Sequence, residues 1–506
     1  MSFNLATMLR ESATATPGKP LVHVHDRTFT YAQVDEISGR VASALLATGL
    51  VRGDKVAVQL PNLPQFLFAY FGILKAGLVM VPLNPLLVAP EVAYHLQDSD
   101  TKVLITFETF AAEAVKGAAQ VDGVTTYVVN LPGNDERPEG TKHFDELYVA
   151  DDTRELVPTE ADDTAVLLYT SGTTGKPKGA ELTHFQLFMN CTVAGGLFDY
   201  QDSDVGIAVL PLFHVFGLSS VLNTSVRYGG TVVLVPRFEM EAVLEAMETH
   251  AVTIFSGVPT MYVALLAADT GSRDLSALRV GVSGGAAIPG EVIRSFEEKF
   301  PGVVVLEGYG LSETASTTTF NVNAEQRKVL SIGKAIWGVQ CRVVDEDDAP
   351  LPAGEEHVGE IVIRGHNVMK GYYNDPEATA EAMRGGWFHT GDLGYVDDDG
   401  FYFIVDRKKD LVIRGGYNVY PREVEEVLYA HPAVAEAAVI GRPDDSLGEE
   451  VVAVVSQLAG AEVTPEELIA WCKERLAAYK YPREVRIVDE LPKGPTGKIL
   501  KKELRG

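Results

Sequence analysis

The stretch YTSGTTGKPKG, residues 169–179, begins at the last residue of the apolar run AVLLY. It crowds hydroxyl side chains, glycines and lysines together, a composition that costs backbone entropy and builds no core. A strand that runs into such a loop offers backbone N–H groups and cations to a phosphate group. The stretch therefore predicts a phosphate-binding loop at the end of a buried strand, with a flexible surface turn as the alternative interpretation.

Two standard phosphate-binding motifs do not fit this stretch. A Walker loop has four residues between its glycines and then Lys-Ser or Lys-Thr, whereas Gly172 and Gly175 enclose two residues and Lys176 precedes a proline. The runs GVSGGA from Gly281 and GYGLSE from Gly308 lack the spacing of a dinucleotide fingerprint. The sequence therefore supports neither a P-loop NTPase nor an NAD enzyme.

Length, charge and cysteine content narrow the class of protein. A chain of 506 residues exceeds a single hydrophobic core and predicts at least two domains. Its 43 basic and 70 acidic side chains give a formal charge of −27, which argues against nucleic acid or an anionic membrane as a partner. Three dispersed cysteines match no metal site or disulfide framework, so we expect a reducing, cytoplasmic location. No transmembrane segment is expected, since Lys75 and Pro82 interrupt the longest apolar run.

Strand and helix signals alternate along the first two thirds of the chain. Thr30 and Gln33 have the spacing of a capping box, and KVAVQL, after the helix that they would open, is typical of a strand. Similar units recur around TKVLITF, GTVVLVP and LRVGVSGG, which predicts doubly wound parallel sheets. After about residue 330, short strands joined by acidic turns indicate a small antiparallel or barrel-like piece.

These patterns predict an α/β fold with two domains. The large N-terminal domain, residues 1–405, would hold two doubly wound α/β subdomains and a small β-barrel-like subdomain. A compact α+β domain, residues 406–506, would follow, because the pattern past Asp406 mixes short strands with helices such as the one opened by Pro421.

Three later stretches add groups that suit a nucleotide. EGYGLSET places Tyr309 between glycines, so that a planar base can lie against its ring, and then offers the Ser312 hydroxyl and the Glu313 carboxylate. In WFHTGDLG, Asp392 lies in a glycine-flanked turn, where a carboxylate can accept from both hydroxyls of a ribose; a simple turn-forming role is the alternative. LPKGPTGKILKKEL presents Lys498 after a Pro/Gly loop, a feature that in isolation is more typical of a solvated tail.

In this order and spacing, the segments resemble the adenylate-forming superfamily of acyl-CoA synthetases, peptide adenylation domains and luciferases. The resemblance runs from about Asp26 to Lys502 and is carried by YTSGTTGKPKGAELTH, PLFHVFGL, GYGLSET, WFHTGDLG, DRKKDLVIRGGYNVYPREVE and PTGKILKKEL. The chain is most similar to a bacterial fatty-acid–CoA ligase. The resemblance implies that ATP activates a carboxylic acid as an acyl-adenylate, and that coenzyme A then displaces AMP.

The resemblance also implies how the site residues divide this work. Thr170 and Glu313 would hold Mg²⁺ on the phosphates of ATP, Tyr309 would stack on adenine, and Asp392 and Arg407 would bind the ribose. The pyrophosphate would be held by Ser171, Thr173, Thr174 and Lys178. The full set implied to bind ATP or AMP is Thr170, Ser171, Gly172, Thr173, Thr174, Gly175, Lys178, Gly284, Gly285, Ala286, Glu307, Gly308, Tyr309, Gly310, Ser312, Asp392, Arg407 and Lys498.

Lys498, His214 and Glu313 are the implied catalytic residues. Lys498 would bridge the acyl carboxylate and the α-phosphate, where a long flexible ammonium can follow the developing charge. The implied acyl pocket is lined by His214, Phe216, Ala286 and Gly310, although a buried structural role is the alternative for His214. The C-terminal domain would be mobile, with Lys409 as the hinge about which it rotates between the two half-reactions.

The nature of the acid is predicted from the residues around PLFHVFGL. Peptide-forming adenylation domains supply an aspartate near this motif for the substrate amine, and residues 209–222 supply none. An apolar pocket, and hence a medium- or long-chain fatty acid, is predicted from Phe213, Phe216, Leu218 and Val221. An aryl acid of the cinnamate or 4-coumarate type is the alternative, followed by a luciferase-like oxygenase and an inactive nucleotide-binding relative.

Free coenzyme A is the expected acceptor of the acyl group. Asp445, Ser446 and Leu447 superficially resemble a carrier-protein phosphopantetheine site, but they precede Lys498, and no carrier-sized extension follows Gly506. The expected partners are therefore ATP, coenzyme A and a small carboxylic acid, with a homodimer left open.

Overall fold

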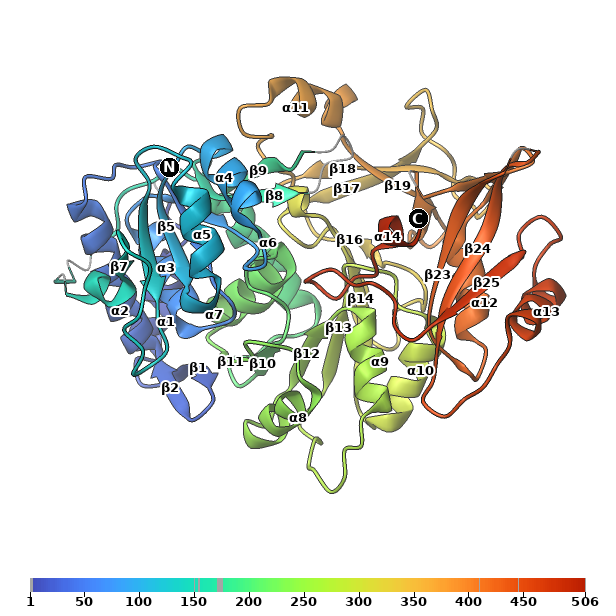
Figure 1. Cartoon of the computed structure of the whole chain (residues 1–506), viewed down its shortest axis with the longest axis horizontal. Helices are drawn as coiled ribbons and strands as arrows, with labels where there is room; N and C mark the ends of the chain where they lie inside the picture. Colours follow the sequence, from blue (N-terminus) through green and yellow to red (C-terminus); the bar gives the residue numbers. More distant parts are fainter. Residues whose placement is uncertain are drawn as a thin grey trace.

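The fold is described from a computed structural model of the chain (Figure 1). It describes residues 3–149, 151–152, 155–170, 176–408, 410–444 and 446–505. The predicted nucleotide-binding residues Ser171, Gly172, Thr173, Thr174 and Gly175, and the predicted hinge residue Lys409, lie outside the described residues.

A seven-stranded sheet forms the first α/β subdomain. In spatial order its strands are β7 (Lys142–His143), β6 (Thr125–Val129), β5 (Thr101–Phe107), β3 (Lys55–Gln59), β4 (Val79–Pro82), β8 (Thr164–Thr170) and β9 (Lys178–Thr183), and only β8 and β9 pair antiparallel. Val56 and Val58 share a core with α2 (Tyr31–Ala47) and α3 (Pro64–Lys75). Ala57 instead packs with α4 (Ala89–Asp98) and α5 (Ala111–Ala118), as the alternation of side chains along a strand requires.

A nine-stranded sheet forms the second subdomain. Its order is β16 (Lys334–Ala335), β15 (Thr319–Phe320), β14 (Val304–Tyr309), β13 (Val280–Ser283), β12 (Ile254–Gly257), β10 (Val205–Ala208), β11 (Thr231–Leu234), β1 (Pro20–Val24) and β2 (Arg27–Thr30). The six strands from β14 to β1 pair in parallel, and β2, β15 and β16 close the two edges antiparallel. The predicted pair of parallel-rich α/β sheets is therefore confirmed.

Helices of three kinds accompany these two sheets. The α-helices are α1 (Thr7–Ala15), α6 (His184–Leu197), α7 (Thr224–Tyr228), α8 (Met240–Thr249), α9 (Pro259–Ala267) and α10 (Gly290–Lys299). A π-helix, η3 (Phe216–Asn223), precedes α7, and short 3₁₀ turns are η1 (Glu108–Phe110), η2 (Phe144–Tyr148) and η4 (Ser312–Thr314). The predicted capping box is present at α2, where Thr30 accepts from the Gln33 backbone and Gln33 accepts from the Thr30 backbone.

The predicted small β piece is a four-stranded antiparallel sheet. Its strands are β17 (Val339–Val344), β18 (Gly359–Gly365), β19 (Phe388–Val396) and β20 (Tyr402–Arg407), with α11 (Pro376–Ala382) and η5 (Arg384–Gly386) between β18 and β19. Among the described residues β17 and β20 do not pair, so the antiparallel character is confirmed and closure into a barrel is not.

A separate core organises the C-terminal residues, drawn in orange and red in Figure 1. The sheet runs β22 (Tyr417–Val419), β21 (Val412–Arg414), β24 (Gly448–Gln457) and β23 (Val434–Asp444), with β25 (Glu484–Val488) parallel to β24. The helices are α12 (Pro421–Tyr429), α13 (Pro465–Arg475) and α14 (Lys501–Leu504). The buried cluster of this unit begins at Val412, whereas that of the larger unit extends to Tyr402. This separation supports a domain boundary near Asp406, which stays a proposal.

The apolar run from Phe66 forms the buried helix α3 and the buried strand β4, joined by a turn at Gly77. Among the described residues, no helix is both long and apolar enough to cross a membrane. Lys75 ends α3 with its side chain 1% exposed, and its ammonium donates to Asp35 Oδ1 at 2.6 Å. Arg10 Nε donates to Asp35 Oδ2 at 2.9 Å, so Asp35 ties α1 and α3 to α2.

We expect Asp35→Ala to lower the free energy of unfolding by about 3 kcal/mol, because it leaves the Lys75 ammonium buried without its carboxylate. Urea denaturation followed by fluorescence would measure the loss. Glu36→Ala is the matched control, since Glu36 pairs with Arg40 on the exposed face of the same helix and such pairs contribute about 0.5 kcal/mol or less. Equal effects of the two substitutions would contradict the role given to Asp35.

Candidate active site

A cavity of about 1280 Å³ lies where the two α/β sheets meet the antiparallel sheet and the C-terminal tail. Thr170, Ser283 and Tyr309 reach it from the carboxyl ends of β8, β13 and β14. Asp392 reaches it from β19, and Lys498 from the loop that precedes α14. Ligands of open α/β sheets bind outside the carboxyl ends of the strands, so this cavity is the candidate active site.

Most described residues that the sequence assigned to the site line this cavity. They are Thr170, Lys178, His214, Phe216, Gly284, Gly285, Gly308, Tyr309, Gly310, Ser312, Glu313, Asp392, Arg407 and Lys498. Ala286 and Glu307 do not belong to the described wall. Ala286 is exposed beyond the turn at Gly285, so its methyl group does not floor the acyl pocket. Leu218 and Val221 also lie elsewhere, in the core beneath η3, while Phe213 and Phe216 line the cavity as predicted.

Tyr309, Asp392 and Arg407 form one polar corner of the cavity. The Tyr309 hydroxyl donates to Asp392 Oδ2 at 2.7 Å, and Arg407 Nε lies 3.2 Å from Asp392 Oδ1. Burial and the neighbouring Asp392 raise the pKa of Tyr309 well above its usual value, so its hydroxyl stays a donor. The Asp392 carboxylate raises the pKa of Arg407. This corner presents an aromatic ring, a carboxylate and a cation to one ligand.

Gly310, the second glycine of GYGLSE, leaves no room for a side chain. A Cβ at Gly310 would lie 1.4 Å from the carbonyl oxygen of Ser316, because the chain turns back here through Ala315 and Ser316 at positive φ. This return brings Glu313, in η4, to the cavity wall, where its Oε1 accepts from the Tyr372 hydroxyl at 3.0 Å. The backbone therefore fixes the carboxylate with respect to the strand end of β14.

Lys498 enters the cavity on a loop of the C-terminal unit. Thr260 Oγ1, in α9, donates to the Gly497 carbonyl at 2.9 Å, and Gly497 itself has φ +80°. The Lys498 side chain then passes so close to Gly285 that a Cβ there would lie 3.0 Å from its Cε. Burial and the Arg407 guanidinium lower the pKa of Lys498 to about 8, while Asp392 works against this shift.

His214 lines the same cavity and interacts electrostatically with Lys498. Burial and the Lys498 ammonium lower the pKa of His214 to about 3, so the imidazole is neutral. Its Nδ1 accepts from the Phe216 backbone N–H at 3.3 Å, which leaves the ring proton on Nε2. His214 therefore offers one N–H donor, and no positive charge, to a ligand beside Lys498.

Glu307, which the sequence assigned to the nucleotide, lies beneath α12. It is 4% exposed, and its Oε2 has no hydrogen-bond partner within the described chain. Burial raises the pKa of Glu307 to about 7, with Arg422 opposing the shift and Glu426 adding to it. Arg422 and Glu426 belong to α12, so Glu307 faces the C-terminal unit and not the nucleotide corner.

Part of the cavity wall is rich in aromatic rings, and we call it the apolar branch; the sequence predicted only some of its residues. Besides Phe213, His214, Val215 and Phe216, the described residues that line it are Ala194, Phe198, Ser220, Val282, Ser283, Ser316, Thr317 and Phe320. Ala194 lies in the last turn of α6, Phe198 is the residue that follows the helix as its C-cap, and Phe320 comes from β15. The four-residue spacing of Ala194 and Phe198 was the available signal, but such spacing does not show which element the two residues pack against.

The comparisons with known proteins agree with this geometry. The family described as "AMP-binding enzyme" matches residues 9–373, and "AMP-binding enzyme C-terminal domain" matches residues 423–498. The chain is 38% identical over 526 residues to "Long-chain-fatty-acid--CoA ligase" of Bacillus subtilis (strain 168), covering 99% of this chain and 94% of that relative. It is 40% identical over 499 residues to "Feruloyl-CoA synthase" of Amycolatopsis sp, covering 97% and 96%.

Among solved structures, the anthranilate CoA ligase AuaEII in complex with anthranoyl-AMP matches with a TM-score of 0.94 at 30% identity, covering 100% of this chain and 97% of that chain. Fold, cavity and relatives together define an AMP-forming acid–thiol ligase. The chain belongs to the AMP-binding enzyme family, as an acyl-CoA ligase with ATP and coenzyme A as co-substrates.

We expect Asp392→Asn to weaken AMP binding about ten-fold, because a carboxylate accepts hydrogen bonds more strongly than an amide. Isothermal titration with AMP measures the change in Kd. Asp399→Asn is the control, since Asp399 lies on the surface, 70% exposed, and pairs with Lys328. An unchanged Kd for Asp392→Asn would exclude Asp392 as a nucleotide ligand.

Proposed function

We propose that this enzyme joins a medium- or long-chain fatty acid to coenzyme A through an acyl-adenylate. One observation carries the proposal: the Lys498 ammonium enters the cavity that Asp392 and His214 also line, and it interacts electrostatically with both. A nucleotide in the corner and an acyl chain in the branch would bring the α-phosphate and the acid carboxylate together at this ammonium. The roles of the individual residues in the two half-reactions are part of this proposal.

In the first half-reaction, a carboxylate oxygen attacks the α-phosphorus of ATP and pyrophosphate leaves. Both reactants are anionic, so positioning and charge stabilisation do most of the work. Lys498 would screen the repulsion between the carboxylate and the α-phosphate and stabilise the charge that builds on the phosphate oxygens. Tyr309 would stack on adenine, Asp392 and Arg407 would hold the ribose, and Lys178 would hold the departing pyrophosphate.

The groups present fit a magnesium ion that arrives with ATP. Mg²⁺ prefers oxygen ligands and keeps several waters, so a hydroxyl, a carboxylate and the phosphates suffice. Thr170 and Glu313 both line the cavity and would supply these two oxygens. When bound, the ion would offset negative charge on the phosphates. Among the described residues, no group of three or more His, Cys, Asp or Glu side chains forms a protein-only metal site.

In the second half-reaction, the thiol of coenzyme A attacks the acyl carbon and AMP leaves. Lys498 fills the space beside Gly285 in this structure, and the unit that carries it has its own core. Rotation of residues 406–506 would withdraw Lys498 and open a path for the thiol, with Lys409 as the proposed hinge. His214 would line that path as a neutral N–H donor.

The apolar branch supports a fatty acid over the aryl alternative. Its walls are mainly the rings of Phe198, Phe213, Phe216 and Phe320, with Ser220, Ser283, Ser316 and Thr317 as the polar groups. A cytoplasmic location and a homodimer stay predictions.

A panel of acids tests the proposed substrate. Each buried methylene contributes about 0.8 kcal/mol, so kcat/KM should rise several-fold with each two-carbon step until the branch is full. The measurement is AMP release that depends on coenzyme A, from hexanoate to hexadecanoate, with benzoate and cinnamate alongside. Good turnover of cinnamate with poor turnover of every aliphatic acid would contradict the fatty-acid substrate and show that the enzyme uses an aryl acid.

The Lys498 pKa of about 8 predicts a pH dependence for adenylation. A lowered lysine pKa means that the ammonium is lost as the pH rises through that value. Measured by ATP–pyrophosphate exchange, kcat/KM should therefore fall above about pH 8. Lys498→Arg should remove this decrease at alkaline pH, because arginine stays charged.

Lys498→Ala should abolish pyrophosphate exchange but leave thiolysis of supplied acyl-adenylate largely intact, since the ammonium serves the first half-reaction. Lys502→Ala, an exposed lysine of the same tail, is the control. Unchanged exchange in Lys498→Ala, or equal loss of both half-reactions, would contradict the assignment.

A further inference from the structure

Phe198 is one of the rings that line the apolar branch. This side chain is 8% exposed, lines the cavity and packs its ring against Phe320, with the ring centroids 5.8 Å apart. On its far side it meets the Tyr200 ring at 6.0 Å. Tyr200 is buried and takes no part in the wall that the described residues give the cavity. Phe198 therefore contacts both the cavity and the buried Tyr200 ring behind it.

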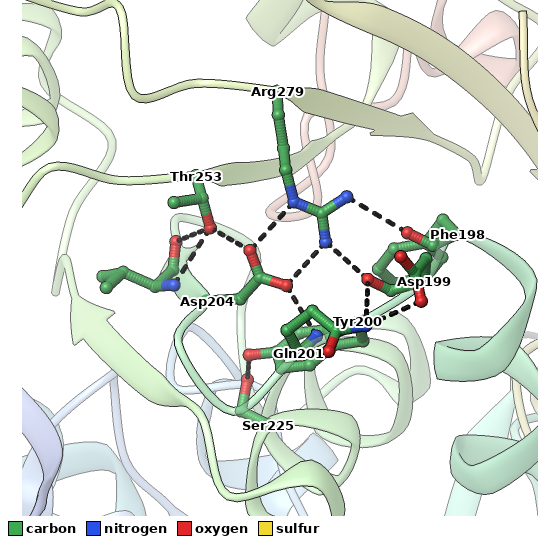
Figure 2. A network of polar contacts seen from close by, with 9 residues as sticks. Phe198, Asp199, Tyr200, Gln201, Asp204, Ser225, Thr253 and Arg279 are labelled. Carbon is green, nitrogen blue, oxygen red and sulfur yellow. Dashed lines mark hydrogen bonds and ion pairs between the residues drawn. The ribbon is translucent and has the colours of Figure 1, made fainter.

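A polar network lies behind Phe198 (Figure 2). Arg279, the residue before β13, donates through Nε to Asp204 Oδ1 at 2.9 Å and through Nη2 to Asp204 Oδ2. Its remaining donors reach two main-chain carbonyls: Nη1 bonds Phe198 O at 3.2 Å and Nη2 bonds Asp199 O at 2.9 Å. One guanidinium thus joins the start of β13 to the main chain of Phe198.

Asp204 is itself held from several sides. Thr253 Oγ1 donates to its Oδ1 at 2.7 Å, and the Gln201 backbone N–H donates to its Oδ2 at 2.8 Å. Asp204 is 4% exposed, and burial alone would raise its pKa, but the bonds from Arg279 and its other donors lower it. The anchor is therefore a charged, fully bonded carboxylate, which fixes the plane of the Arg279 guanidinium.

The C-terminal end of α6 does not by itself fix the position of Phe198. Gly195 and Gly196 occupy the last turn, and glycine weakens a helix relative to alanine. Asp199 follows with φ +53°, a left-handed conformation that is unfavourable for a residue with a Cβ. The bonds from Arg279 to the Phe198 and Asp199 carbonyls secure this weak point, so the ring position depends on Arg279.

We infer that Phe198 is a specificity-determining residue that sets the longest acid the enzyme accepts, and that Arg279 is a positioning residue that acts through it. The inference rests on the proposed function, because it takes the apolar branch as the acyl site. Neither Phe198 nor Arg279 belongs to the polar corner of Tyr309, Asp392 and Arg407, so neither substitution should change the KM for ATP.

The first test compares kcat/KM across acids from hexanoate to hexadecanoate. In Phe198→Ala the optimum should move to a longer acid, with at least a ten-fold gain for the first acid that the wild type rejects for length. The KM for ATP should stay within two-fold of the wild-type value. Phe188→Ala is the matched control: Phe188 lies on the same helix, packs on Phe3 and is outside the described cavity wall. An unchanged chain-length optimum in Phe198→Ala would overturn the inference.

The second test separates positioning from general stability. Arg279→Lys keeps a cation beside Asp204 but cannot reach both carbonyls, so discrimination against over-long acids should fall several-fold at unchanged KM for ATP. Because Arg279 acts through Phe198, the same substitution should have little further effect on the profile in the Phe198→Ala background. Arg273→Lys, which alters a surface pair with Glu241, is the control. A lower melting temperature with an unchanged profile would leave Arg279 a purely structural residue.

The panel also includes benzoates with para-alkyl chains of increasing length. If the wild type uses only aryl acids, the proposed fatty-acid substrate is wrong, yet the limiting para-alkyl length should still increase in Phe198→Ala. If that limit does not move, the inference fails independently of the proposed function.

Discussion

The position of the Lys498 ammonium is the constraint on which the rest of the structure depends. A charge in a cavity costs solvation free energy, and the fold meets that cost by bringing Asp392 near while keeping His214 neutral. The charge also arrives from a unit with its own hydrophobic core, through a loop secured only by contacts such as Thr260 to Gly497. A strong positive charge that can be withdrawn suits a reaction in which two anions meet first and a thiol arrives second.

The cavity wall around Tyr309 could be predicted from the sequence, because short motifs fix short-range geometry. Tyr309, Gly310 and Glu313 lie within five residues, and the return of the chain at Gly310 follows from a contact with Ser316 only six residues away. The alternation of strands and helices likewise indicated two parallel-rich sheets, since each βα unit carries its own capping and turn signals. Local signals sufficed wherever the partners were close in sequence.

The errors lie where a residue's role depends on distant parts of the chain. Glu307 was assigned to the nucleotide, yet α12 of the C-terminal unit covers it. Leu218 and Val221 were expected in the acyl pocket, but η3 directs Phe216 and Ser220 to the cavity and the other two into the core. Phe198 owes its place to Arg279, 81 residues further along the chain. No local pattern encodes these contacts, which form only when the sheets and the two units pack.

In the proposed reaction, a carboxylate oxygen of the acid attacks the α-phosphorus of ATP. The most direct test of this claim is turnover of an acid whose carboxylate carries a heavy oxygen isotope, followed by mass spectrometry of the products. Attack by the carboxylate oxygen predicts a single labelled oxygen in the phosphate of AMP, because that oxygen stays on phosphorus when the thiol displaces AMP. Unlabelled AMP, or label recovered in inorganic phosphate together with ADP, would contradict the claim.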